Sequence, residues 1–202
     1  MRCSMYTKFF VALTFSESTA SRKIHGFRKR FDPKFNEHVE PHMSMLAPFE
    51  IHRKDRSELL ESLKDEIDNF FVGCEDTPKL QFKGLDVYRH RRKNILYLNP
   101  DLGDDLGYCL EGVQQLCESF IPPEVNYKQN AKQFLPLGHF TQDFQLHKVL
   151  EIAKQEFPNS GDLFLSGISI YEKRFGIWIE VEQLISFENP NDNFLQLQHA
   201  SI

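Results

Sequence analysis

The chain has 202 residues, of which 41% are hydrophobic, and a formal net charge of −5 at pH 7. This length and apolar content exclude a disordered chain, and the acidic balance excludes a general attraction to nucleic acid, so any contact with a polyanion must be local. No apolar run approaches the roughly 18–20 residues of a membrane-spanning helix, and we therefore expect a soluble protein with no membrane partner.

The first predicted element is a strand at residues 9–15, FFVALTF. Such a run near an N-terminus resembles a secretion signal, but it is at the short limit of the roughly 7–15 apolar residues of those signals. An arginine- and lysine-rich helix is expected over about residues 18–31, and the triplet His-Met-Ser follows at 42–44. The same order of strand, helix and His-x-Ser/Thr triplet returns within residues 94–141, which favours the strand.

Two amphipathic helices and two hairpins extend this repeat. Apolar residues recur at spacings of three and four within 56–71 and 145–157, which predicts a helix in each stretch. The stretches 82–100 and 165–183 both contain a glycine, alternating apolar residues, a tyrosine, a charged turn and a second apolar run, and each predicts a two-stranded hairpin. At a constant offset of 83 the matched pairs are Gly84 with Gly167, Leu85 with Ile168, Val87 with Ile170, Tyr88 with Tyr171, Leu96 with Ile179 and Leu98 with Val181.

The repeat indicates an α+β protein of two pseudo-symmetric lobes. Each lobe is expected to be a small, mostly antiparallel sheet with helices on its outer face, and a central cleft is expected between the lobes. No linker rich in proline, glycine or serine divides the chain, so residues 1–202 are predicted to form a single two-lobed domain, with 188–202 as a loosely ordered tail.

The four cysteines show no metal-binding or redox spacing. Cys3, Cys74, Cys109 and Cys117 form no CxxC motif, and the last two lie in a helix-like stretch as small core residues. A reducing, cytoplasmic environment is the simplest interpretation.

Two His-x-Ser/Thr triplets, HMS at 42–44 and HFT at 139–141, carry the chemistry. On a strand, residues i and i+2 point to the same face, so His42 would stand beside Ser44, and His139 beside Thr141. Across a cleft, one neutral imidazole can take a proton from water while the other, charged, protonates a leaving oxygen. The two hydroxyls can donate hydrogen bonds to a phosphate, which suits phosphodiester chemistry without a metal or any other cofactor.

The alternative is that these histidines are structural. Among eight histidines about one such triplet is expected by chance, and a third triplet, HAS at 199–201, lies in the tail outside the repeat. The matching positions of the other two favour a functional role. His38 and His42, four residues apart, would suit a metal only on a helix, which Pro41 interrupts, so no metal site is expected.

With these features the chain resembles the 2H phosphoesterase superfamily, the group of 2′-5′ RNA ligase-like proteins and cyclic nucleotide phosphodiesterases. The resemblance covers about residues 6–187. It rests on one His-x-Ser/Thr motif in each half and on the stretch HGFRKRFDPKFNEHVEPHMSMLAPFE, with its arginine-rich helix end, Asp-Pro and Pro-His-x-Ser. It implies that His42 and His139 are the catalytic acid/base pair and that Ser44 and Thr141 bind phosphate.

By this resemblance the expected activity is metal-free opening of a 2′,3′-cyclic phosphate, or of a related cyclic or 2′-5′ phosphodiester, on an RNA end or a nucleotide. The alternative is a catalytically weak RNA- or nucleotide-binding module on the same fold. Asp143 favours it, because a carboxylate on the strand face of His139 and Thr141 could repel a phosphate or hold the histidine protonated. A monomer is expected.

Further candidates each have a plainer interpretation. Arg28 and Arg30 could contact substrate or lie on a solvated helix end, and the basic tip at 89–93 could guide RNA or be a solvated turn. Tyr88 and Tyr171 could stack on a base but are more simply packing residues of the hairpins. Trp178 is expected in the core.

Overall fold

The structure is a computed structural model, which describes residues 5–35, 41–73, 77–90, 93–127, 133–158 and 162–187. Helices are interspersed among the strands along the chain, and a short 3-10 helix, η2, precedes α2. In order, the elements are β1 (Tyr6–Phe15), α1 (Thr19–Phe31), β2 (His42–Ser44), β3 (Phe49–His52), η2 (Arg53–Asp55), α2 (Arg56–Phe71), β4 (Lys79–His90), β5 (Lys93–Asp101), α3 (Gly103–Ser119), β6 (Leu135–Phe140), α4 (Asp143–Glu156), β7 (Leu163–Arg174) and β8 (Ile177–Ser186).

One antiparallel sheet links two lobes. Its main path has the strand order β2-β1-β7-β4-β5-β6, while β3 also pairs with β1 and β8 with β7. The path passes from β7 to β4 through the short pairing of Lys79 with Phe164 and Leu80 with Leu163. We call β1, β2, β3, β7 and β8 the first lobe, and β4, β5 and β6 the second lobe. The expected α+β fold with two lobes is confirmed.

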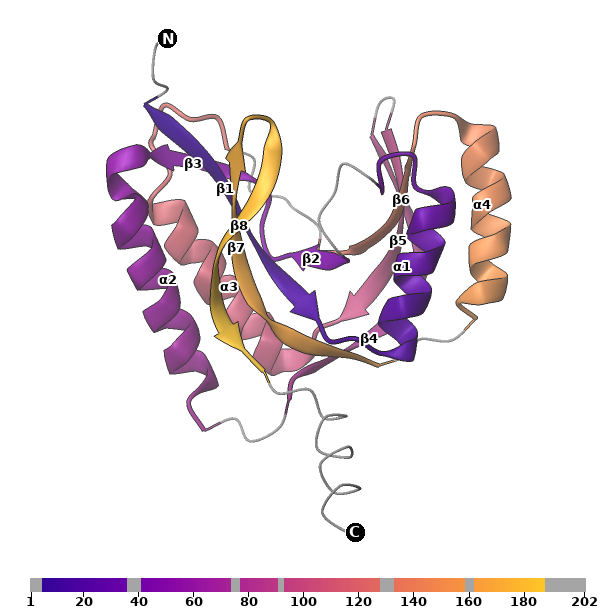
Figure 1. The fold of residues 1–202 in the computed structure, drawn as a ribbon, viewed down its shortest axis with the longest axis horizontal. Coiled ribbons are helices and arrows are strands. Elements are labelled where there is room, and N and C mark those ends of the chain that lie inside the picture. The colour runs from indigo at the N-terminus through magenta and orange to yellow at the C-terminus, as the bar shows by residue number, and fades with distance from the viewer. Residues whose placement is uncertain are drawn as a thin grey trace, which may run out of the picture.

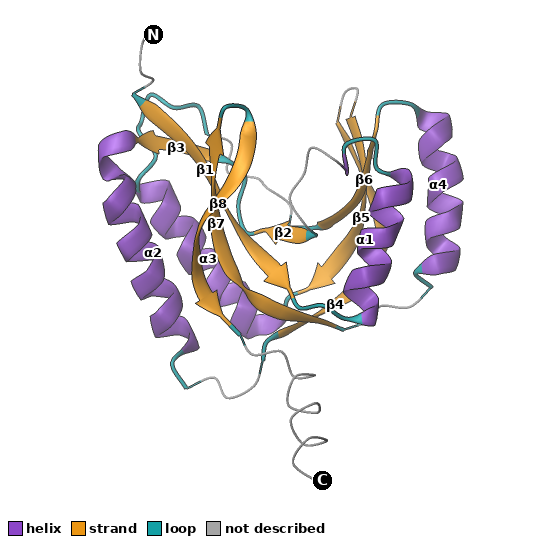
Figure 2. Ribbon diagram, in the orientation of Figure 1, coloured by secondary structure: helices purple, strands orange, loops and turns teal. Residues whose placement is uncertain are grey.

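The helices lie outside the two lobes. Helices α2 and α3 pack together and cover the first lobe, whereas α1 and α4 pack against β5 and β6 of the second lobe (Figure 1). The sheet surfaces that face away from the helices turn toward each other across the middle of the molecule (Figure 2).

The lobes are assembled differently from the repeat in the sequence. The first half of the sequence supplies β1, β2 and β3, and β1 of this group pairs with β7 of the second half, while α1 packs on β6 of the second half. Each lobe therefore combines elements of both repeats. In the pairing of β1 with β7, Phe10 lies opposite Tyr171 and Ala12 opposite Ser169.

The two faces of β1 show how the sequence selects the core. Phe9, Val11 and Leu13 are fully buried in the main core, under the helices of the first lobe. Phe10 and Ala12, which point to the other face, form a second small cluster on the inner surface. Burial on both faces explains why residues 9–13 are continuously apolar, and the prediction of a strand over 9–15 is confirmed.

Both predicted hairpins are present, as β4 with β5 and β7 with β8. Their matched glycines serve different purposes. Gly84 has a φ of 127° at an irregularity of β4, a conformation that side chains with a Cβ rarely adopt. Gly167 is needed for space, because a Cβ there would lie 2.2 Å from the carbonyl oxygen of Ile185.

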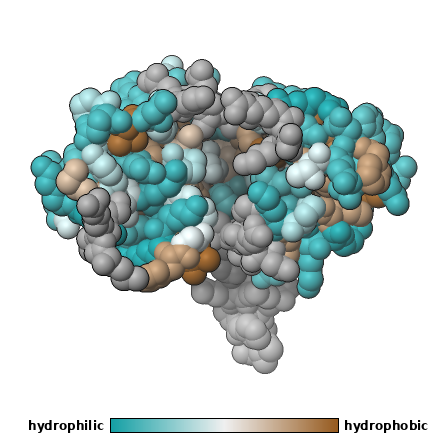
Figure 3. Space-filling view, turned by 90° about the horizontal axis from the view of Figure 1, so that it is seen from above, coloured by the Kyte–Doolittle hydropathy of each residue, from teal (hydrophilic) through white to brown (hydrophobic). Residues whose placement is uncertain are grey.

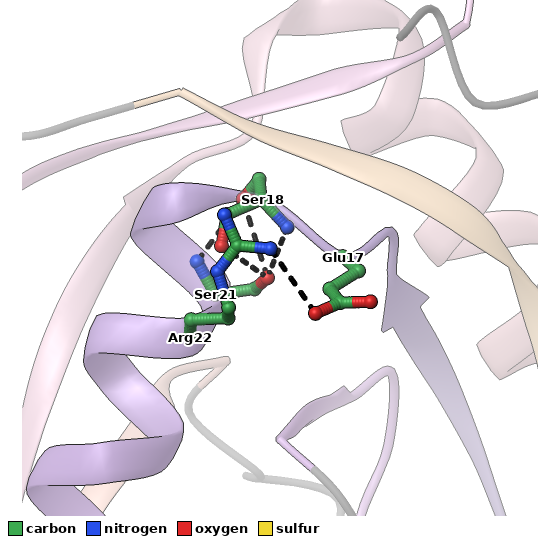
Figure 4. A network of polar contacts seen from close by, with 4 residues as sticks. All are labelled: Glu17, Ser18, Ser21 and Arg22. Carbon is green, nitrogen blue, oxygen red and sulfur yellow. Dashed lines mark hydrogen bonds and ion pairs between the residues drawn. The ribbon is translucent and has the colours of Figure 1, made fainter. Parts of the chain in front are cut away.

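Helix α1 begins at a reciprocal cap that Figure 4 shows in detail. The Ser18 hydroxyl accepts the backbone N–H of Ser21 at 3.0 Å, and the Ser21 hydroxyl accepts the N–H of Ser18 at 2.7 Å. Beside it, Arg22 forms an ion pair with Glu17 at 3.1 Å. The cap sets the start of the helix shortly after β1, and thirteen residues later its other end reaches β6.

Cys109 and Cys117 are buried free thiols on α3, as expected. Burial raises the pKa of Cys109 to about 12, so this thiol remains protonated. In the part of the chain that the structure describes, none of the helices combines the length and apolarity needed to cross a membrane. Cys3, Cys74, His38 and residues 188–202 lie outside the described residues.

Candidate active site

The two triplets lie on strands that meet. Strands β2 and β6 are the two ends of the strand path, yet they contact each other. The sheet therefore curls until its ends come together in the middle of the molecule (Figure 1). His42 and Ser44 are on one of these strands, His139 is on the other, and Thr141 directly follows it.

On β2 the alternation expected for a strand holds. His42 lies opposite Thr14 and Ser44 opposite Ala12, so both side chains share the inner face of the first lobe. Met43 lies opposite Leu13 and is fully buried in the main core. His42 and Ser44 are both half-buried.

On β6 the strand holds His139 but not Thr141, so the alternation expected for this triplet does not extend to its hydroxyl. His139 lies opposite Ile95, and its side chain is 23% exposed. Phe140 points to the other face and is buried against the helices of the second lobe. Strand β6 ends at Phe140, so Thr141 is exposed in the bend that leads to α4. Viewed from above, the surface is hollowed between the two lobes (Figure 3).

An aromatic shelf, formed by Phe10, Tyr171 and Trp178, supports His42. The Phe10 ring stacks on Tyr171 at 4.7 Å between centroids and meets Trp178 edge-on at 4.7 Å. The His42 ring lies 5.3 Å from Phe10 and 6.2 Å from Tyr171. Tyr171 is a buried packing residue, as expected. Trp178 is only partly buried and packs against the small cluster of Phe10, Ala12 and Tyr171, so it is not part of the main core.

The hydroxyl of Tyr171 points to a carboxylate. It donates a hydrogen bond to Glu180 at 3.3 Å, and Ser169 donates another at 3.2 Å. Burial, together with the charge of Glu180, raises the pKa of Tyr171, so its hydroxyl stays protonated. On the second lobe, Tyr88 is 41% exposed and is therefore not the buried packing residue that the repeat predicts.

Asp32 contacts His139 from the end of α1. Its carboxylate oxygen Oδ1 accepts the backbone N–H of His139 at 3.2 Å, and Oδ2 lies 3.4 Å from Nδ1 of the imidazole. The side chain of Asp32 is fully buried. Burial tends to raise the pKa of Asp32, but the hydrogen bonds from His139 and from the backbone of Lys34 hold it below its ordinary value. Asp32 is not among the site residues predicted from the sequence, although the Asp-Pro directly after a predicted helix is a signal for it.

The two arginines of α1 differ in exposure, and Arg30 alone fits the solvated helix end that the sequence allows. Arg28 is buried, with 1% of its surface exposed, so this part of the helix is not solvated. Arg30 lies on the outer layer, where it forms an ion pair with Glu156 of α4 at 2.6 Å and covers the ring of Phe31. Its contacts turn it toward α4, away from the inner surface that carries the triplets.

Asp143 does not lie on the strand face of His139. It is the first residue of α4, and its carboxylate accepts hydrogen bonds from Arg89 at 3.0 Å and Asn94 at 2.9 Å. Asn94 lies opposite Phe140, on the face covered by helices. The expected position beside His139 and Thr141 is therefore wrong, because β6 ends before the chain reaches Asp143.

The basic tip at 89–93 is described only in part. Arg89 binds Asp143, whereas Arg91 and Arg92 and the side chains of His90 and Lys93 lie outside the described part of the structure. Within the described residues, no three histidine, cysteine, aspartate or glutamate side chains converge to hold a metal ion.

Comparisons with known proteins agree with this architecture. The solved structure of Escherichia coli LigT complexed with 3′-AMP matches at 13% identity and a TM-score of 0.54, over 91% of this chain and 99% of LigT. Kluyveromyces marxianus Usb1 matches at 11% identity and a TM-score of 0.50, over 86% of this chain and 97% of Usb1. A search among curated proteins finds no match. The family model for the 2′-5′ RNA ligase superfamily matches residues 15–164, which include both triplets. The chain therefore belongs to the 2′-5′ RNA ligase superfamily, within the 2H phosphoesterases.

Proposed function

We propose that this protein is a metal-independent phosphoesterase that opens a 2′,3′-cyclic phosphate, or a related cyclic or 2′-5′ phosphodiester, on an RNA end or a nucleotide. One observation carries the proposal. The two ends of the curled sheet, β2 with His42 and β6 with His139, contact each other, which supports a shared site for the two histidines. Two imidazoles on facing strands supply both a proton acceptor and a proton donor.

In this reaction one histidine is the base and the other the acid. The neutral imidazole of His42 or His139 takes a proton from water as the water oxygen bonds to phosphorus. The charged imidazole of the other histidine gives its proton to the ribose oxygen as the P–O bond of the ring breaks. The product is a 2′- or 3′-phosphate monoester on the nucleotide or RNA end, and the two histidines return to their starting states by exchange with solvent.

Ser44 and Thr141 are proposed to bind the phosphate. Each follows its histidine by two residues, so its hydroxyl can donate to a non-bridging oxygen while the imidazole is at the reacting bond. Ser44 is held on the strand β2, whereas Thr141 lies in the bend after β6. We therefore expect Ser44 to be the more rigid of the two donors.

The ligand of LigT fits this reaction class. The LigT structure contains 3′-AMP, and a nucleoside 3′-phosphate is what remains when a 2′,3′-cyclic phosphate opens at its 2′ bond. This relationship supports a cyclic phosphate as the first substrate to test here.

The test is incubation of the EDTA-treated protein with 2′,3′-cyclic nucleotides and with a short RNA that ends in a cyclic phosphate. Phosphorus NMR follows ring opening and reports which bond breaks. Wild-type protein should open the ring, and replacement of His42 or His139 by alanine should lower the rate by about 10²–10⁴-fold. The double variant, checked for folding by its melting temperature, is the control for contaminating activity.

Two results would count against the enzyme. Full activity in both single variants would remove the two-histidine mechanism. Saturable binding of cyclic nucleotides without ring opening, measured by calorimetry, would instead identify a nucleotide-binding module on this fold.

A further inference from the structure

The contact between Asp32 and His139 goes beyond the paired triplets. Asp32 is the residue directly after α1, and its Oδ1 also accepts the backbone N–H of Lys34 at 3.1 Å, which fixes the turn that ends the helix. The same oxygen takes the backbone N–H of His139, on the side of β6 that does not pair with β5. Two backbone N–H groups thus hold the carboxylate in place, in addition to its contact with the imidazole.

The position and charge of this carboxylate determine which nitrogen of the His139 ring carries the proton. A carboxylate that accepts two N–H groups and is held below its ordinary pKa is ionised at neutral pH, and an ionised carboxylate can only accept hydrogen bonds. Its Oδ2, at 3.4 Å, therefore requires a proton on Nδ1 of His139. When the ring is neutral, the lone pair then lies on Nε2.

We propose that Asp32 is a positioning residue that orients the His139 ring and holds its reactive nitrogen, Nε2, toward the inner surface between the lobes. This inference rests on the proposed function for its catalytic meaning. Asp32 touches no substrate in this scheme and acts only through His139.

The same device is not repeated at the end of α3, the helix that corresponds to α1. Helix α3 ends at Ser119, and the proline that follows it, Pro122, is preceded by Ile121 instead of an aspartate. His42 lies against the ring of Phe10. The two histidines therefore differ in their surroundings, although the sequence presents them as equivalents.

The decisive variant is Asp32→Asn. The amide retains an oxygen for the backbone N–H groups, but its NH₂ can only donate toward Nδ1, which forces the neutral ring into the Nε2–H form. That form has no lone pair on the reactive nitrogen. We expect kcat for ring opening to fall by roughly 10²–10⁴-fold with KM changed less than about threefold, as in other enzymes where the orienting carboxylate is neutralised.

A second readout does not depend on activity. Nitrogen-15 NMR of histidine-labelled protein at alkaline pH, with the His139 signals assigned by His139→Gln, reports which nitrogen bears the proton. Wild type should show the Nδ1–H form and Asp32→Asn the Nε2–H form. If the wild-type protein opens no cyclic phosphate, this readout still tests the pairing, so failure of the proposed function and failure of this inference are distinguishable.

Glu172→Gln is the matched control. Glu172 is another buried, hydrogen-bonded carboxylate, with partners Thr7 and Arg174, and it contacts neither histidine. This variant should lose stability and keep kcat. An Nε2–H ring in the wild type, or a folded Asp32→Asn protein with unchanged kcat or an unchanged tautomer, would overturn the proposal. Should Asp32→Asn fail to fold, the wild-type spectrum alone decides.

Discussion

Replacement of Phe10 by leucine tests whether the aromatic shelf supports catalysis or only stabilises the fold. Phe10 is 3% exposed, and its ring meets Tyr171 and Trp178 at 4.7 Å each and His42 at 5.3 Å. Leucine keeps most of the apolar volume but loses the ring contacts, which are worth about 0.5–1.5 kcal/mol per aromatic pair. We expect a loss of about 1–2 kcal/mol in the free energy of unfolding. For a chain of this size that corresponds to a fall of roughly 2–8 °C in Tm.

The effect on catalysis should be larger than the effect on stability suggests. Without the flat ring beneath it, His42 can shift, and a displacement of about 1 Å in a reacting group can cost about 10²-fold in rate. Steady-state kinetics of ring opening should therefore show kcat reduced by roughly ten- to a hundredfold.

Phe9→Leu is the matched control, because Phe9 is the neighbouring residue of the same type, is fully buried, and points to the main core, where it packs near Phe49. It should lower Tm by a similar amount and leave kcat unchanged. Equal kcat values for the Phe9 and Phe10 variants would show that the shelf only stabilises the fold, and the reasoning about His42 would fail.

Two further predictions concern carboxylates. Asp143→Asn should change kcat for ring opening by less than about twofold, because the Asp143 side chain binds Arg89 and Asn94 on the helix-covered face. A strong gain in activity would contradict this and place the charge of Asp143 near the phosphate. Burial tends to raise the pKa of Glu172, but hydrogen bonds from Arg174 and Thr7 hold it below its ordinary value of 4.5. Its stabilising effect is therefore present above that pH and is lost as pH falls through the lowered pKa. Urea unfolding should accordingly show that wild type exceeds Glu172→Gln by about 1–3 kcal/mol near pH 7, and that the difference shrinks below about pH 4.5; a constant difference would contradict the assignment.

The sequence predicts the local elements well because their signals are local. Alternating apolar residues with a glycine and a charged turn identify both hairpins, and the spacing of leucines identifies α2 and α4. The placement of His42 and Ser44 on one face follows from strand geometry alone. The internal repeat then identifies the triplets at 42–44 and 139–141 as equivalent positions.

The remaining features depend on contacts between distant parts of the chain. Nothing near residue 143 indicates that β6 ends at Phe140 and that the carboxylate turns to Arg89. The burial of Arg28 and the approach of Asp32 to His139 both follow from where α1 packs, which is on β6, a strand from the other half of the sequence. A repeat shows that two halves are alike, but it does not show that they exchange elements.

The exchange of elements has a consequence for how the protein is made. Strand β1 and its long partner β7 lie far apart along the chain, since Ala12 pairs with Ser169. At the usual elongation rates of about 5–20 residues per second, the edge of β1 that faces β7 waits roughly ten to thirty seconds on the ribosome for its partner. Apolar segments exposed in this way attract chaperones and aggregate. Residues 9–15, the stretch that resembles a secretion signal, thus belong to the strand that waits for β7 during synthesis.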